Sequence, residues 1–143
     1  MATLKSRTLG VSIARDPGRV CAFVANLENL PKWATTFCLS IERAGGAWIA
    51  QTPQGPVTIR IASRNELGVL DHYVSPSPGV EVYVPMRVVP SGSGSEVLFT
   101  LFRRPEMTDA QYAEDQRLVE QDLATLKRVL ERGSSAPDTK GAG

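Results

Sequence analysis

The chain contains a single histidine, His72, and this side chain is the best candidate for chemistry. It lies in the alternating segment GVLDHYV (68–74), where a strand would direct it toward the apolar face. A desolvated imidazole stays neutral more readily, so His72 could act as a general base or orient a ligand carbonyl. The alternative is a core histidine that bonds to water or to a helix carbonyl. Asp71 cannot orient the imidazole, because neighbours on a strand point to opposite faces.

Aromatic side chains and one arginine complete the candidate site. The aromatics most able to reach a cavity are Trp33, Phe37, Trp48, Phe99 and Tyr112, although each could equally belong to the core. Arg43 is predicted at a strand end beside Trp48, where it would bind an anionic head group or extend along the rim to water. The predicted ligand-binding set is Trp33, Phe37, Arg43, Trp48, Ile61, His72, Met86, Phe99 and Tyr112.

The residue types present argue against several other chemistries. One histidine leaves no His/Cys cluster for a metal, and we expect no cofactor. Cys21 and Cys38 are too few for a disulfide framework, which indicates buried reduced thiols and a cytoplasmic protein. The glycine-rich segment SGSG (91–94) joins two predicted strands, with no helix after it to hold phosphate, so we predict a hairpin turn there.

The composition is that of an ordinary globular protein, with 42% hydrophobic and 22% charged residues. A formal charge of +1 gives no reason to expect nucleic acid or an anionic membrane as a partner. The sequence contains no apolar run long enough to span a bilayer and no signal peptide, so we expect no stable membrane insertion. The length predicts one domain, residues 1–132, followed by a small, polar and disordered tail, residues 133–143.

A long C-terminal helix, predicted over residues 108–132, is the element against which the candidate residues must pack. Its apolar residues recur at helical spacing and lie on one face: Tyr112, Val119, Leu123, Leu126 and Leu130. Thr108 and Gln111 fit a capping box at its start, and Gly133 fits a left-handed cap at its end.

The N-terminal segment predicts a strand and two short helices. Residues 7–13 alternate as a half-buried strand does, and Asp16 before Pro17 marks the start of the first helix. Residues 27–37 predict a second short helix, broken at Pro31.

Residues 39–103 alternate with a period of two and predict six antiparallel strands. The turns that set their registers are Gly45-Gly46, Pro53-Gln54, the turn around Asn65 to Gly68, the SPSPG loop (75–79) and SGSG. The predicted opposed pairs are Arg43 with Trp48, Trp48 with Ile59, Ile61 with His72, His72 with Val82, and Met86 with Phe99. Pairing of the first strand with the last would give an α+β fold, a curved seven-stranded antiparallel sheet wrapped around the long helix.

Three segments carry a resemblance to a known group: VSIARDPGRVCAFVANLENLPKW (11–33), GVLDHYV (68–74) and residues 87–131. Through them the chain resembles the START-like helix-grip (SRPBCC) superfamily, which includes polyketide cyclases/dehydrases and lipid-transfer domains. The resemblance implies a deep, mostly apolar cavity between the sheet and the long helix that binds hydrophobic small molecules. In some relatives the cavity also performs chemistry, but the superfamily has no universal catalytic motif, so the fold assigns no activity.

Binding of a hydrophobic small molecule is therefore the first hypothesis, in an internal pocket of roughly 300–600 Å³ with His72 on its wall. The second is a polyketide cyclase/aromatase-like or hydratase-like enzyme. In that case His72 would act as the base, and Tyr112 or Arg43 would polarise a carbonyl.

A protein-interaction module is the third hypothesis. Ile49, Leu98 and Phe102 interrupt the otherwise polar face of the predicted sheet. The same residues would serve a homodimer contact, so we expect a monomer or a homodimer. A filled cavity would favour this third hypothesis, and an open cavity would favour the first two.

Overall fold

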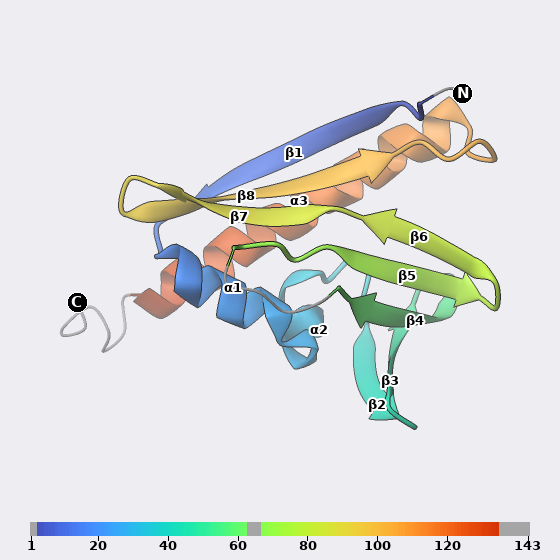
Figure 1. Ribbon diagram of the computed structural model, residues 1–143, viewed down its shortest axis with the longest axis horizontal. Coiled ribbons are helices and arrows are strands. Elements are labelled where there is room, and N and C mark those ends of the chain that lie inside the picture. Colours follow the sequence, from blue (N-terminus) through green and yellow to red (C-terminus); the bar gives the residue numbers. More distant parts are fainter. Residues whose placement is uncertain (1–2, 63–66, 135–143) are drawn as a thin grey trace.

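The structure is a computed structural model that describes residues 3–62 and 67–134 (Figure 1). Its strands are β1 Ser6–Ile13, β2 Ser40–Ala44, β3 Ala47–Thr52, β4 Gly55–Ile61, β5 His72–Ser77, β6 Val80–Val84, β7 Met86–Ser91 and β8 Gly94–Phe102. Its helices are α1 Pro17–Ala25, a 3₁₀ turn Leu27–Asn29, α2 Leu30–Trp33 and α3 Asp109–Ser134. Asn65 of the predicted turn and the predicted tail from residue 135 onward lie outside the described residues.

Local hydrogen bonds from side chains set the starts of the helices. The Asp16 carboxylate accepts from the Arg19 N–H at 3.1 Å and begins α1. At α3, Thr108 and Gln111 exchange hydrogen bonds between side chain and backbone at 2.9 and 3.0 Å, so the predicted capping box is confirmed. The prediction that Gly133 ends this helix is wrong, because α3 continues past it. A glycine inside a helix costs only about 1 kcal/mol relative to alanine, which helical packing readily offsets.

The second predicted helix, over residues 27–37, is shorter than expected. It forms as the 3₁₀ turn and then α2, and Pro31 lies in the first turn of α2 instead of breaking it. A proline is tolerated there because its missing N–H would have had no partner within the helix. α2 ends at Trp33, whose side chain is buried.

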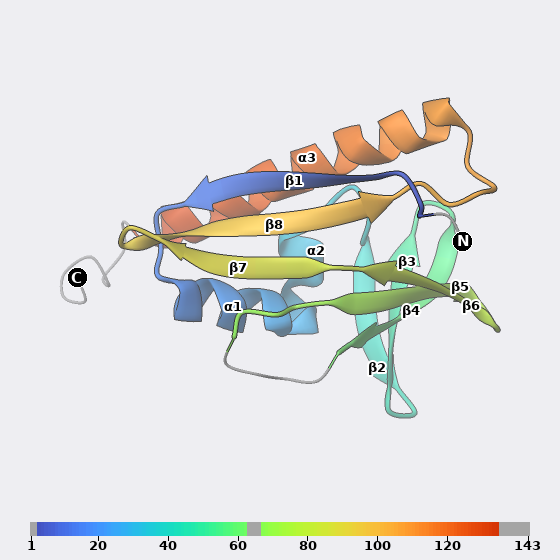
Figure 2. The ribbon, with the colours of Figure 1, turned by 45° about the horizontal axis from the view of Figure 1, so that its top comes forward.

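The eight strands of the described residues form two antiparallel sheets, so the predicted single seven-stranded sheet is wrong. One sheet has the order β1-β8-β7 and the other β2-β3-β4-β5-β6. The strand predicted between SPSPG and SGSG is divided at Pro85, which has no N–H to give to a ladder; β6 pairs with β5, and β7 pairs with β8. The predicted pairing of the first strand with the last is confirmed. Figures 1 and 2 show β1, β8 and β7 side by side, with β6 and β7 end to end and β5 beside β6, and α3 runs behind this layer in Figure 1.

Four of the five opposed pairs predicted above are confirmed: Arg43 with Trp48, Trp48 with Ile59, Ile61 with His72, and Met86 with Phe99. The fifth is wrong by two residues, because His72 lies opposite Val84 and not Val82. An irregularity between Val74 and Ser77 shifts the pairing of β5 with β6. A shift of two residues leaves every side chain on the same face of the strand, so the inward direction predicted for His72 is unaffected.

The hydrophobic core lies against the second half of α3. Leu123, Leu126 and Leu130 are buried there, as their helical spacing predicts. Val119, one turn earlier, is only partly buried because it borders a cavity. Within the described ranges, no helix is both long and apolar enough to cross a membrane.

The carboxylate of Asp71 joins the two sheets where they meet. Its Oδ1 accepts from the Met86 backbone N–H at 2.9 Å and from Arg87 Nε at 3.2 Å. Its Oδ2 accepts from Tyr83 Oη at 2.7 Å and from Arg87 Nη2 at 3.0 Å. Burial alone would raise the pKa of this carboxyl, but the hydrogen bonds from Arg87, Tyr83 and Met86 outweigh burial and lower it to about 2. Asp71 thereby fixes the start of β5 against β6 and β7, and with it the position of His72.

Replacing Asp71 with asparagine should lower the free energy of unfolding by about 2 kcal/mol at pH 7, because the lowered pKa of this carboxyl corresponds to an energy of that order. A lowered carboxyl pKa stabilises the folded state above about pH 4, and the stabilisation is lost as the pH falls toward about 2. The difference between wild type and Asp71→Asn should therefore shrink over that range in urea unfolding.

Glu81→Gln is the matched control for this experiment. Glu81 also pairs with an arginine, Arg60, at 3.0 Å, but both side chains are about half exposed, at 49% and 59%. An exposed pair of this kind contributes less than about 1 kcal/mol. Equal losses for Asp71→Asn and Glu81→Gln would contradict the role assigned to Asp71.

Candidate functional site

A cavity of about 360 Å³, here called the main cavity, lies between α3 and residues of β3, β4, β5, β6 and β8. Its volume falls within the range of roughly 300–600 Å³ expected for a small-molecule pocket. The apolar residues that line it are Trp33, Ala34, Phe37, Pro53, Val57, Val74, Pro76, Val82, Val84, Phe99, Leu101, Leu118 and Val119. The polar residues that line it are Thr36, Thr52, Gln54, His72, Arg104, Asp115 and Asp122.

Several apolar side chains around the main cavity are only partly buried, although they pack against the core. Phe37, Val57, Phe99 and Val119 are of this kind. In a filled core their remaining surface would be covered, and covering apolar surface is favourable by roughly 25 cal/mol per Å². The uncovered surface is therefore available to an apolar ligand.

His72 begins β5 and lies on the wall of the main cavity. Its ring stands edge-on to that of Phe99, with the ring centroids 6.1 Å apart and an angle of 65° between the planes. Its Nδ1 lies 3.1 Å from the carbonyl oxygen of Leu70. Burial lowers the pKa of His72, and the Leu70 carbonyl and the negative charge of Asp71 oppose this only in part. The imidazole is therefore neutral at pH 7.

The Leu70 carbonyl also fixes which nitrogen of His72 carries the proton. A carbonyl oxygen can only accept, so Nδ1 must donate. Nε2 of the neutral ring then carries a lone pair, and it can accept a hydrogen bond or act as a base. Nδ1 thus bonds to a backbone carbonyl, as the core-histidine alternative expects. The carbonyl belongs to the segment before β5 and not to a helix. Asp71 does not orient the ring, as predicted, because its carboxylate is bound by residues of β6 and β7.

A polar pair, one buried and one partly buried side chain, borders another part of the main cavity. Asp122 of α3 accepts from the Thr36 backbone N–H at 3.0 Å and from Thr36 Oγ1 at 2.8 Å. Burial raises the pKa of Asp122 although these hydrogen bonds oppose the shift, and burial also raises the pKa of Asp115. Arg104 lines the cavity too, and its Nε lies 2.8 Å from Glu106 Oε2. Within residues 3–62 and 67–134, no three histidine, cysteine or acidic side chains come together as metal ligands would.

Six of the nine predicted site residues line the main cavity or a smaller cavity that shares walls with it. Those on the main cavity are Trp33, Phe37, His72 and Phe99. Two more, Ile61 and Met86, line a smaller cavity of about 40 Å³, here called the inner cavity. The side chains that line both cavities are Trp33, Phe37, His72 and Val74.

The other three predicted residues, Arg43, Trp48 and Tyr112, line neither cavity. Arg43 and Trp48 oppose each other in the β2–β3 hairpin, which extends away from α3 in Figure 1. The Arg43 guanidinium lies over the Trp48 ring, 5.4 Å from its centroid, in a cation–π contact. Tyr112 is buried near the start of α3, and its Oη donates to the Leu101 carbonyl at 2.9 Å. Neither Arg43 nor Tyr112 is placed to polarise a carbonyl in the main cavity.

Sequence reasoning missed Thr36, Asp115 and Asp122. Asp115 lies four residues before Val119 and Asp122 lies three residues after it, so both fall within the apolar stripe of the long helix. An acidic residue inside an apolar stripe is the signal that could have found them. Thr36 gives no comparable signal, because it lies in an irregular segment after α2.

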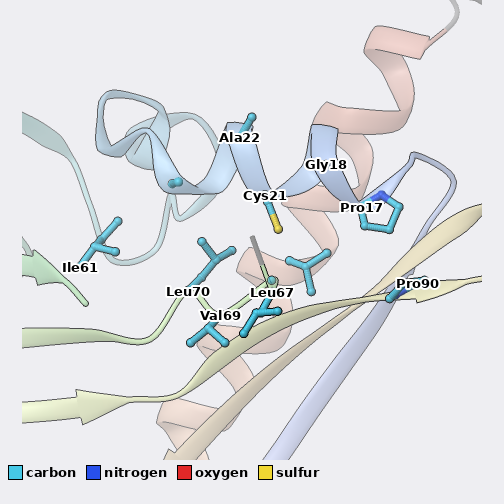
Figure 3. A pocket seen from close by; sticks show the side chains of 12 residues that line it. Pro17, Gly18, Cys21, Ala22, Ile61, Leu67, Val69, Leu70 and Pro90 are labelled. Atoms are coloured by element: carbon cyan, nitrogen blue, oxygen red, sulfur yellow. The ribbon is translucent and has the colours of Figure 1, made fainter. Parts of the chain in front are cut away.

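A second hollow of about 550 Å³, here called the α1 groove, lies between α1 and a wall formed by residues 67–70 and part of β7 (Figure 3). Cys21 is its one side chain with reactive chemistry among the described residues, and burial raises the pKa of that thiol, which keeps it protonated. Leu67 at its edge is 82% exposed. Although the α1 groove is larger, the main cavity is the better candidate site because it combines an apolar wall with an imidazole.

Comparison with known proteins identifies the fold but no family. No family model matches the chain, and no curated protein matches it by sequence. XoxI from Bacillus cereus has a similar structure, with a TM-score of 0.72 and 18% identity over 88% of this chain and 95% of that one. DynU16, a protein of the dynemicin biosynthetic locus, matches with a TM-score of 0.70 and 16% identity over 90% of this chain.

The di-domain ARO/CYC BexL, from the BE-7585A biosynthetic pathway, matches with a TM-score of 0.67 and 17% identity over 94% of this chain. The chain covers 48% of DynU16 and 48% of BexL, so it spans about half the length of each. At these identities the likeness shows the fold alone. The protein thus has an α+β fold, with a C-terminal helix packed on antiparallel sheets, that it shares with XoxI, DynU16 and BexL.

Proposed function

We propose that the protein binds an apolar small molecule of two or three fused aromatic rings in the main cavity. The observation that carries the proposal is a cavity of about 360 Å³ whose apolar side chains keep part of their surface uncovered. A space of that volume accommodates a molecule of two or three fused rings. The fold likeness to BexL, an ARO/CYC protein, supports a ligand of this kind.

The polar groups around the main cavity support a binding mode with few directed contacts. Thr36 is bound to Asp122, and Thr52 Oγ1 donates to the Gly55 carbonyl at 2.7 Å. His72 Nε2, by contrast, has no hydrogen-bond partner among the described residues. The ligand would therefore be held by apolar burial and oriented chiefly by one acceptor nitrogen.

The interaction-module hypothesis receives less support. This hypothesis predicts a cavity filled by side chains, whereas the main cavity is open, with a volume of about 360 Å³. Phe102 on the outer face is stacked with Tyr83, which is itself stacked with Tyr73, at centroid distances of 6.3 and 5.3 Å. These aromatics already cover one another in part.

An enzyme is the second candidate function, and the neutral His72 with an unprotonated Nε2 is the observation that favours it. Such a nitrogen can remove a proton from a bound ligand. The sequence-based proposal that Tyr112 or Arg43 would assist does not fit, because neither lines the main cavity. Of the catalytic residues proposed from the sequence, only His72 thus remains on the main cavity, which makes simple binding the better supported function.

Binding of naphthalene tests the proposed function. Wild-type protein should bind it and melt at a higher temperature in its presence, because a ligand that binds only the folded state stabilises it. Val57→Phe adds a ring to the wall of the main cavity and should weaken binding about tenfold or more. Fluorescence titration measures the dissociation constant.

Two control variants locate the binding site. Val89→Phe makes the same change at a side chain that is 38% exposed on β7, and it should leave binding unchanged. Ala22→Phe obstructs the α1 groove and should also leave binding unchanged. No binding by wild type, or a loss with Ala22→Phe but not with Val57→Phe, would refute the proposed site.

Proton exchange in a ketone probe tests the second candidate. If His72 acts as a base, the protein should accelerate exchange of the acidic protons of 2-tetralone with deuterated water by about a hundredfold. His72→Leu should abolish the acceleration and retain naphthalene binding. Exchange at the same rate with and without the protein would leave binding as the function.

A further inference from the structure

The inner cavity has one unusual feature, a pair of nitrogen-bearing side chains in an otherwise apolar lining. Its volume is about 40 Å³, and among the described residues that line it only Trp33 and His72 have a ring nitrogen. The rest of the lining is aliphatic, phenyl or thioether. A single water molecule has a share of about 30 Å³ in the liquid, so this cavity fits one oxygen atom with its hydrogens.

Trp33 Nε1 is a buried donor without a hydrogen-bond partner among the described residues. The side chain is 4% exposed, and an indole N–H in the interior usually has an acceptor. Leaving such a donor unpaired destabilises the folded state. An oxygen atom in the inner cavity would supply the missing acceptor.

His72 has the complementary requirement. Its Nδ1 donates to the Leu70 carbonyl, so its Nε2 can only accept. The inner cavity is therefore lined by one side chain that needs an acceptor and one that needs a donor. A hydroxyl group is the smallest group that is both at once, whereas a carbonyl or an ether oxygen can only accept.

We propose that the inner cavity is a hydroxyl subsite: a ligand hydroxyl placed there donates to His72 Nε2 and accepts from Trp33 Nε1–H. The ligand class is a hydroxylated aromatic, with its rings in the main cavity and its hydroxyl in the inner cavity. The two cavities share Trp33, Phe37, His72 and Val74 as walls, which brings them within the reach of one molecule. This proposal rests on the proposed function, since the rings must first bind in the main cavity.

The subsite discriminates between oxygen-containing groups. A ketone or a methyl ether in the same place would accept from Trp33 Nε1–H. It has no hydrogen to donate to His72 Nε2, so its lone pair would face and repel the lone pair of that nitrogen. A hydrocarbon would leave both nitrogens unpaired. Preference for a hydroxyl over both is therefore the signature of the subsite.

Three probes of one ring system test the proposal: naphthalene, 2-methoxynaphthalene and 2-naphthol, titrated at pH 7 into the full chain. Wild type should bind 2-naphthol about tenfold tighter than naphthalene and should gain nothing from the methoxy group. Trp33→Phe and His72→Leu should each reduce the preference for 2-naphthol to about twofold or less and leave the affinity for naphthalene within a few-fold. Phe37→Leu is the matched control, because Phe37 lines both cavities without a polar atom, so this variant should change all three affinities alike.

The wild-type protein gives a second measurement that no folding defect can obscure. The two tryptophans give two indole N–H signals in a proton–nitrogen correlation spectrum, and comparison with Trp48→Phe would assign them. The Trp33 signal should move downfield with 2-naphthol and much less with naphthalene.

Equal affinity of wild type for naphthalene and 2-naphthol, with no selective movement of the Trp33 signal, would overturn the hydroxyl subsite and leave the proposed function standing. Failure of wild type to bind naphthalene and 2-naphthol alike would overturn both.

Discussion

One buried carboxylate holds the structure together at the place where its two sheets meet. Pro85 separates strand β6 from strand β7. The Asp71 carboxylate binds residues on both sides of it, the Met86 N–H of β7 and Tyr83 Oη of β6. The Thr100 N–H adds a hydrogen bond to the Pro85 carbonyl at 3.0 Å. Because side chains alternate along an extended chain, fixing Asp71 on the outer side directs its neighbour to the inner side. This outer contact and the backbone hydrogen bond from the Leu70 N–H to the Met86 carbonyl, at 2.8 Å, together place the imidazole in the cavity.

The two halves of α3 have different surroundings. Leu123, Leu126 and Leu130, toward its C-terminal end, are buried and pack in the core. Closer to its start, Leu118 and Val119 line the main cavity and remain partly exposed. The packed half supplies the burial that stabilises the fold, so the other half can leave space beside the sheet. A ligand in that space would cover surface that the chain itself leaves uncovered.

Much of the fold could be predicted from the sequence because turn residues specify hairpins locally. Gly45 and Gly46 have φ values of 59° and 82°, which glycine adopts without strain, and the register they predict for β2 and β3 is the one observed. The division of the sheet at Pro85 was not predicted, since a proline inside an alternating pattern marks either an edge or a break. The β5–β6 register could not be predicted, because an irregularity between Val74 and Ser77 changes which residues lie opposite each other. It leaves the alternation of apolar and polar residues as it was.

The candidate site could be predicted only in part, for a physical reason. Alternation places a side chain on a face but does not say how far along the strand the helix covers that face. Arg43 and Trp48 therefore share a face with His72 and yet lie in a hairpin beyond α3. Asp122 could have been found from its place in the apolar stripe, whereas its partner Thr36 depends on how the segment after α2 runs in space.

The function proposed for the main cavity depends on an unprotonated imidazole nitrogen that a ligand can reach. Because the chain has one histidine, a long-range proton–nitrogen spectrum of the labelled protein contains the signals of a single imidazole. We predict the neutral tautomer with its proton on Nδ1 at pH 7, retained as the pH falls to the ordinary pKa of histidine, since burial lowers the pKa of His72. A proton on Nε2, or a charged ring at pH 7, would show that His72 offers no acceptor to a ligand in the cavity.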